Sequence, residues 1–144
     1  MFARTAILCR CIRRFDQILD GDDVAISKIL VVDDTNTDRV NLQGILQSAG
    51  YQVITACSGR EAMDKAASEH PDLIFMDIVM EDMDGFQACR QLTKADDTKH
   101  IPVVMVSSKD QKVDVMWSRR QGARAYIVKP YTPEQITSEV QKLQ

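Results

Sequence analysis

Five short apolar runs are spaced along the chain from residue 28 onward, and segments with helical periodicity separate them. The runs are rich in Val, Ile and Leu and show little apolar–polar alternation; they occupy residues 29–32, 52–56, 73–76, 103–107 and 125–128. Such composition is typical of parallel strands that are covered on both faces. The strict alternation of strands and helices predicts an α/β fold, with a five-stranded parallel sheet and right-handed crossovers.

The intervening segments carry helix start and stop signals. Ser58 and Glu61 have the spacing of a capping box, and Thr132 precedes Pro133 as an N-cap precedes an N1 proline. The segment from about 110 to 121 has its apolar residues at helical spacing. On the first of these helices, the expected apolar positions are Leu42, Ile45, Leu46 and Ala49. On the segment from about 110 to 121, they are Val113, Met116 and Trp117.

Polar side chains stand where four of the apolar runs end: Asp33 and Asp34, Asp77, Ser107, and Lys129. Because the carboxyl ends of parallel strands meet at one edge of the sheet, we expect these side chains to lie together. Three converging aspartates repel one another unless a cation is present, and Mg²⁺ prefers oxygen ligands. The alternative for the adjacent pair is that it only begins a turn, a position that aspartate favours.

This set of residues suits phosphoryl transfer. Asp77 stands alone on an expected central strand and is the candidate nucleophile, which would form an aspartyl phosphate. Asp33 and Asp34 are better placed to hold metal and water. Lys129 can neutralise phosphoryl charge, and the Ser107 hydroxyl can donate a hydrogen bond to a phosphoryl oxygen.

Composition narrows the class of protein. The 144 residues predict one domain with a sizeable core, and the net charge of −3 gives no reason to expect nucleic acid as a partner. No apolar stretch is long enough to span a bilayer. The four cysteines have no zinc-site spacing, so free thiols in a reducing cytoplasm are expected.

Residues 1–27 stand apart from this pattern as an N-terminal extension, and 28–144 form the expected domain. Four arginines and a possible apolar face could make residues 1–23 a basic amphipathic helix that binds a membrane surface or a partner. The alternatives are a poorly ordered extension, or a segment that is not translated because synthesis starts at Val24.

Four motifs resemble the receiver domain of bacterial two-component response regulators: Asp33-Asp34, FMDIVM…MDG over 75–85, PVVMVSS over 102–108, and YIVKP over 126–130. The resemblance covers residues 28–144. It implies a flavodoxin-like sheet of strand order 2-1-3-4-5 and a cis Lys129–Pro130 bond.

The resemblance also implies functional roles for site residues. Asp77 would be the phosphoacceptor. Asp34 and Asp77 would bind Mg²⁺ directly together with the Val79 backbone carbonyl, and Asp33 would act through water. Ser107 and Lys129 would sense the phosphoryl group, and Tyr126 would change rotamer. For Tyr126, simple core packing is the alternative. For Trp117, packing is the expectation from the residue type, and partner docking on its helix is what the resemblance implies.

The segments GFQACRQLTK, SSKDQ…W and RRQGARAYIVKP are similar to stand-alone receivers of the chemosensory systems that control type IV pilus twitching and phototaxis. They imply a phosphoacceptor switch rather than an enzyme, phosphorylated by a sensor histidine kinase. Its downstream protein would bind at the 108–126 surface. The chain would be a monomer or a weak, phosphorylation-linked dimer. The alternatives are a Mg²⁺-dependent phosphohydrolase with an aspartyl nucleophile, and a phosphate sink without output.

Two positions depart from the receiver pattern. Glu81 replaces the proline usual four residues after the phosphoacceptor, which predicts a less rigid and more acidic loop. Val79 has no polar side chain to orient an attacking water, and this predicts a long-lived phosphoryl group.

Overall fold

The computed structural model describes residues 25–144, which form five strands and five helices in alternation. The strands are β1 (Lys28–Val32), β2 (Gln52–Ala56), β3 (Leu73–Asp77), β4 (Val103–Ser107) and β5 (Ala125–Val128). The helices are α2 (Asn36–Ser48), α3 (Gly59–Glu69), α4 (Gly85–Lys94), α5 (Lys112–Arg120) and α6 (Pro133–Lys142). The predicted strands are confirmed to within one residue at each end.

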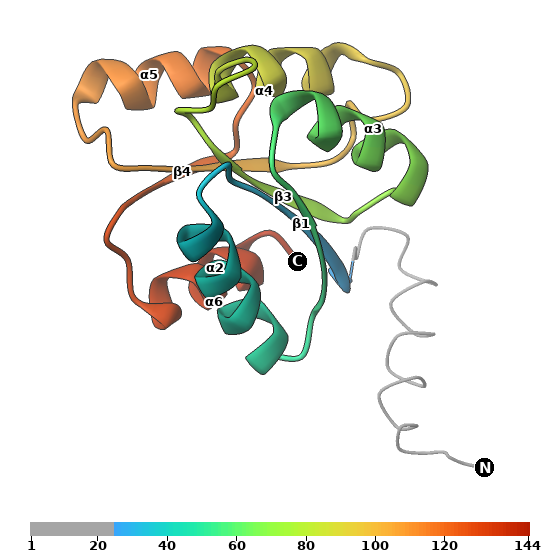
Figure 1. Cartoon of the computed structure of the whole chain (residues 1–144), viewed down its shortest axis with the longest axis vertical. Helices are drawn as coiled ribbons and strands as arrows, with labels where there is room; N and C mark the ends of the chain where they lie inside the picture. The colour runs from blue at the N-terminus through green and yellow to red at the C-terminus, as the bar shows by residue number, and fades with distance from the viewer. Residues whose placement is uncertain (1–24) are drawn as a thin grey trace.

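All five strands are parallel and pair in the order β2-β1-β3-β4-β5. The α/β fold and the strand order implied by the receiver resemblance are therefore confirmed. Figure 1 shows α3, α4 and α5 on one face of the sheet, and α2 and α6 on the other. The sheet order reverses at β1 and β3, which is where open parallel sheets usually place their sites.

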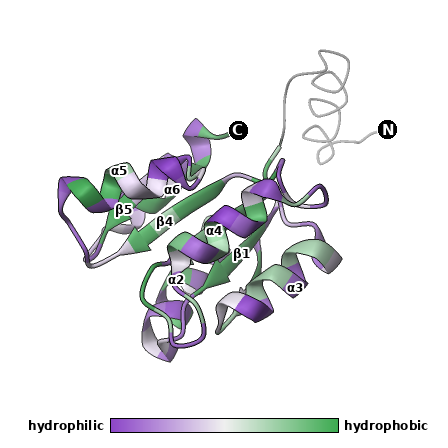
Figure 2. Cartoon of the chain, turned by 90° about the horizontal axis from the view of Figure 1, so that it is seen from above, coloured by the Kyte–Doolittle hydropathy of each residue, from purple (hydrophilic) through white to green (hydrophobic). Residues whose placement is uncertain are grey.

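Each face of the sheet has its own hydrophobic core, because alternate residues of a strand point to opposite faces. On β3, Ile74 and Met76 pack with the α3 and α4 residues Ala66 and Leu92. Their neighbour Phe75 packs on the opposite face with Leu46 of α2. Every residue of β3 is buried, which explains its unbroken apolar sequence before Asp77. Figure 2 shows that the strands are apolar, whereas the helices have both apolar and polar residues.

The helix start signals hold with one correction. The Ser58 side chain accepts a hydrogen bond from the Glu61 N–H, as a capping box requires. The Glu61 carboxylate, however, accepts from the Cys57 N–H at 2.8 Å and not from the backbone of Ser58 itself. The predicted capping box is therefore wrong in its second bond, because Glu61 bonds to Cys57, the residue before the N-cap Ser58. The box at Thr132 and Gln135 is complete.

Three large apolar residues of α5 lie in solvent and not against the sheet. Val113, Met116 and Trp117 are 62%, 59% and 47% exposed, so the expectation that Trp117 packs in the core is wrong. The buried residue of this helix is Ser118 instead. A helix that leaves its large apolar side chains in solvent has a surface suited to binding another molecule.

The predicted N-terminal extension falls almost entirely outside the described residues. At the start of those residues, Asp72 fixes the chain by accepting hydrogen bonds from the backbone N–H groups of Ser27 and Lys28 at 2.9 and 3.0 Å. Cys57 and Cys89 are free thiols, as expected. None of the helices formed by residues 25–144 is long and apolar enough to cross a membrane.

Candidate phosphoryl and metal site

The strand ends bring the predicted polar residues together at one edge of the sheet. Asp33 follows β1 directly, Asp77 is the last residue of β3, and Ser107 is the last residue of β4. Ser107 pairs in register with Val128, the last residue of β5, so Lys129 lies one residue beyond the end of that neighbouring strand. Residues that are far apart in sequence thus share one site because the sheet is parallel.

Asp33, Asp34 and Asp77 form the carboxylate cluster. One oxygen from each lies within 4.8 Å of the others, which is close enough for all three to contact a single cation. Asp33 and Asp77 are buried, whereas Asp34 is exposed. A set of oxygen donors with one side open to water fits Mg²⁺, which usually keeps several waters.

The electrostatics of Asp77 also suit the binding of a cation. Burial, and then repulsion from Asp33, raise the pKa of Asp77 from 3.8 to about 6, although Lys129 opposes the rise. The carboxylate is still mostly ionised at neutral pH, so it remains available as a nucleophile. A divalent cation beside it would remove the repulsion that disfavours the charged form.

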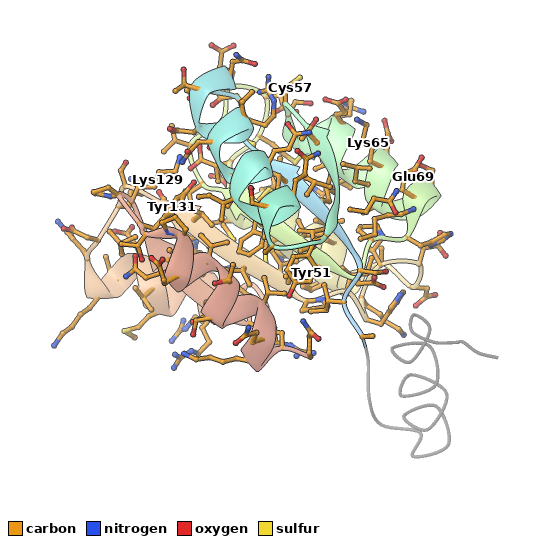
Figure 3. All side chains as sticks on the ribbon, turned by 90° about the horizontal axis from the view of Figure 1, so that it is seen from below. Tyr51, Cys57, Lys65, Glu69, Lys129 and Tyr131 are labelled. Carbon is orange, nitrogen blue, oxygen red and sulfur yellow. The ribbon has the colours of Figure 1, made fainter. Side chains whose placement is uncertain are left out.

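Lys129 contributes an ammonium group to the site. Its Nζ lies 2.9 Å from Asp38 Oδ2, 3.0 Å from Asp33 Oδ2 and 3.7 Å from Asp77 Oδ1. Burial alone would lower the pKa of Lys129, but its hydrogen bonds to Asp38 and Asp33 outweigh burial and raise it. Figure 3 labels Lys129 beside Tyr131 in the loop between β5 and α6. The Lys129–Pro130 bond is cis, as predicted.

Ser107 and Tyr126 are joined through the backbone of Lys109. The fully buried Ser107 hydroxyl oxygen accepts from the Lys109 N–H at 3.2 Å. The half-buried Tyr126 hydroxyl donates to the Lys109 carbonyl oxygen at 2.6 Å. The loop between β4 and α5 is therefore held by both predicted switch residues, at the start of the 108–126 surface.

The loop after Asp77 is held by contacts that the local sequence does not indicate. Asp82 accepts hydrogen bonds from the Gly59 and Arg60 N–H groups at 3.0 and 2.9 Å, which lowers the pKa of Asp82. This attachment to the first turn of α3 supplies a restraint that Glu81 does not. Val79 is 58% exposed within this loop.

The structure brings Asp33, Asp34, Asp77 and Lys129 together, and places Ser107 on the adjacent strand. The chemical roles of these residues, and of Val79 and Tyr126, remain predictions. Asp38 is the site residue that sequence reasoning missed. It lies in the first turn of α2, 91 residues from Lys129, and nothing in the local sequence indicates that pairing.

Known proteins share both the sequence and the fold. Residues 29–141 match the family model of the response regulator receiver domain. Protein PilH of Pseudomonas aeruginosa is 44% identical over 115 residues, which cover 80% of this chain and 95% of PilH. Protein PilG of the same organism is 37% identical over 113 residues, covering 78% of this chain and 84% of PilG.

A structural comparison agrees with these matches. The chemotaxis protein CheY4 of Vibrio cholerae superimposes with a TM-score of 0.78 at 32% identity, covering 83% of this chain and all of the CheY4 chain. The family match extends over most of the chain and overlaps every strand and helix described above. The chain therefore belongs to the response regulator receiver domain family.

Proposed function

We propose that this chain is a phosphorylation-controlled switch, in which a sensor histidine kinase donates a phosphoryl group to Asp77. The observation that carries this proposal is the convergence of Asp77 with Asp33, Asp34 and Lys129 at the carboxyl edge of the sheet. An ionised nucleophile, an acidic cation site and an ammonium group are the parts that phosphoryl transfer needs.

In the proposed reaction, an Asp77 carboxylate oxygen attacks the phosphorus atom of a phosphohistidine. The new O–P bond forms as the P–N bond breaks, and the histidine leaves as the neutral imidazole after taking up a proton. Mg²⁺ held by Asp34, Asp77 and the Val79 carbonyl, with Asp33 acting through water, would neutralise phosphoryl charge. Lys129 would neutralise it from the side of β5.

The phosphoryl signal would leave the site through Ser107. In the structure, the Ser107 hydroxyl oxygen accepts a hydrogen bond from the Lys109 N–H. A hydrogen bond from the same hydroxyl to a phosphoryl oxygen would pull the Ser107 side chain away from Lys109. Since Tyr126 is bonded to the carbonyl of the same residue, the loop and the tyrosine would move together. Phosphorylation would thus alter the 108–126 surface, where Trp117 is exposed.

We propose that the chain acts in the cytoplasm and that a downstream protein binds this surface. The output would be pilus-based motility or taxis. The similarity to PilH and PilG supports the biological setting. Val79 disfavours the rival phosphohydrolase, because it supplies no ionisable group two residues beyond the nucleophile.

Intact-mass measurement tests the proposed function. We expect the wild-type chain to gain one phosphoryl group when incubated with Mg²⁺ and acetyl phosphate, and Asp77→Ala to gain none. Trp117 is the single tryptophan, so its fluorescence should change only in the wild type. A wild-type chain that takes up no phosphoryl group under these conditions would refute the switch.

Replacing Val79 is expected to shorten the lifetime of the aspartyl phosphate. In Val79→Asn, a side-chain amide at this exposed position could orient water toward phosphorus, and we expect decay about tenfold faster than in the wild type. The measurement is the loss of phosphoryl mass over time after the donor is removed. Val40→Asn, at an exposed valine on α2, is the matched control and should decay like the wild type.

A further inference from the structure

Asp38 forms an ion pair with Lys129 that lies outside the metal cluster. The 2.9 Å separation from Asp38 is the shortest of the three carboxylate contacts of the Lys129 ammonium, and the 3.7 Å separation from Asp77 is longer than a hydrogen bond. In this geometry the ammonium is hydrogen-bonded to Asp38 and Asp33, and its ion pair with the proposed phosphoacceptor Asp77 is longer than a hydrogen bond.

Asp38 pairs with Lys129 and not with Arg39, its neighbour on α2. Arg39, the other charged residue of this helix, donates to the Asp33 carbonyl oxygen at 2.7 Å and to Asn36 Oδ1 at 2.8 Å. Its guanidinium is thus engaged elsewhere, and Lys129 is the cation that contacts Asp38. The Lys129 side chain is 18% exposed and that of Asp38 is 43% exposed, so water screens the pair only in part.

We propose that Asp38 is a positioning residue that holds Lys129 away from Asp77 until a phosphoryl group arrives. This inference rests on the proposed function of Asp77. In the resting chain, Asp38 neutralises the ammonium and keeps it from a closer contact with Asp77, although the ammonium still donates to Asp33. After phosphorylation, contact with the phosphoryl oxygens draws Lys129 toward Asp77 and weakens its bond to Asp38.

Opposite effects on two ligands follow from this arrangement. Without the Asp38 charge, Lys129 is free to pair more fully with Asp33 and Asp77, so Mg²⁺ meets a competing cation and binds more weakly. A phosphoryl group meets the reverse situation, because the ammonium is already available and one repelling carboxylate is gone. A residue with only a structural role would weaken both kinds of binding when replaced.

The test compares wild type, Asp38→Asn, Asp38→Glu and Asp64→Asn by titration calorimetry. The first titration measures the Kd of Mg²⁺ alone, and the second measures the Kd of beryllofluoride, a phosphoryl mimic, at saturating Mg²⁺. For Asp38→Asn we expect roughly threefold to fivefold weaker Mg²⁺ binding and beryllofluoride binding tighter by a similar factor, the scale of one partly exposed ion pair. Asp38→Glu keeps the charge and should restore values near the wild type. Asp64→Asn removes a charge from the exposed side of α3 and should change neither Kd.

Each outcome decides between the possibilities. Weaker binding of both ligands in Asp38→Asn, or no change in either, would overturn the role of Asp38 while leaving the proposed function intact. A wild-type chain that binds no beryllofluoride would overturn the proposed function and this inference together. Thermal unfolding of each variant confirms that the comparison is made between folded chains.

Discussion

An alanine in place of Gly85 is expected to lower the free energy of unfolding by about 3 kcal/mol. The Cβ atom of that alanine would lie 2.2 Å from the Asp77 carbonyl oxygen and 2.7 Å from the Ile78 Cα. Both are backbone atoms, which cannot rotate out of the way as a flexible side chain can. The Gly85 N–H also donates to the Ile78 carbonyl oxygen at 2.7 Å, so α4 begins in direct contact with the end of β3.

Urea denaturation of Gly85→Ala and Gly44→Ala measures this effect against a matched control. Gly44 lies inside α2, and a Cβ atom added there would meet no other atom within 4 Å, so alanine should raise stability by about 0.5–1 kcal/mol. Displacement of the backbone at Asp77 should also weaken Mg²⁺ binding in Gly85→Ala alone. Wild-type stability and Mg²⁺ affinity in Gly85→Ala would show that the contact is not tight.

Replacing Asp77 with asparagine is expected to stabilise the metal-free chain at pH 7.5 by about 1–3 kcal/mol, the scale of the pKa shift. Burial and the charge of Asp33 raise the pKa of Asp77 from 3.8 to about 6 in the folded chain. The folded state therefore holds the Asp77 proton more tightly than the unfolded state does. The stability that this proton contributes is fully present below pH 3.8 and is lost as the pH rises through 6.

The measurement is the difference in unfolding free energy between Asp77→Asn and the wild type, taken without Mg²⁺ from pH 4 to pH 7.5. We expect the difference to grow through this range and to shrink when saturating Mg²⁺ is added, because only the wild type retains all three carboxylates. Asp97→Asn, at an exposed position in the loop after α4, serves as the control with no such dependence. A difference that is constant with pH would show that ionised Asp77 carries no destabilising repulsion.

The strands could be predicted closely because a sheet covered on both faces needs apolar runs, and four of the five runs end at the polar residues of the site. β3 is the clearest case, since its buried apolar residues lead directly to Asp77. The capping signals at Ser58 and Thr132 depend on neighbouring residues only, so they too could be found in the sequence. The converging aspartates followed from the same logic, because parallel strands align their carboxyl ends.

Long-range side-chain pairing could not be predicted in this way. Asp38 and Lys129 meet only because α2 and the loop after β5 pack at the same end of the sheet, and Asp82 reaches the first turn of α3 through a similar juxtaposition. The sequence also did not predict which way the apolar residues of α5 face. Periodicity shows that a helix has an apolar side, but it does not show whether that side meets the sheet or the solvent, as Trp117 illustrates.

Residue-level mass spectrometry after incubation with acetyl phosphate tests the central role of Asp77 most directly. With Mg²⁺ present, we expect one phosphoryl group per chain, carried by Asp77 alone, and none when EDTA removes the metal. Phosphoryl uptake on another residue, or uptake that persists without Mg²⁺ or in Asp77→Ala, would contradict the proposal that this carboxylate cluster is a metal-dependent phosphoacceptor site.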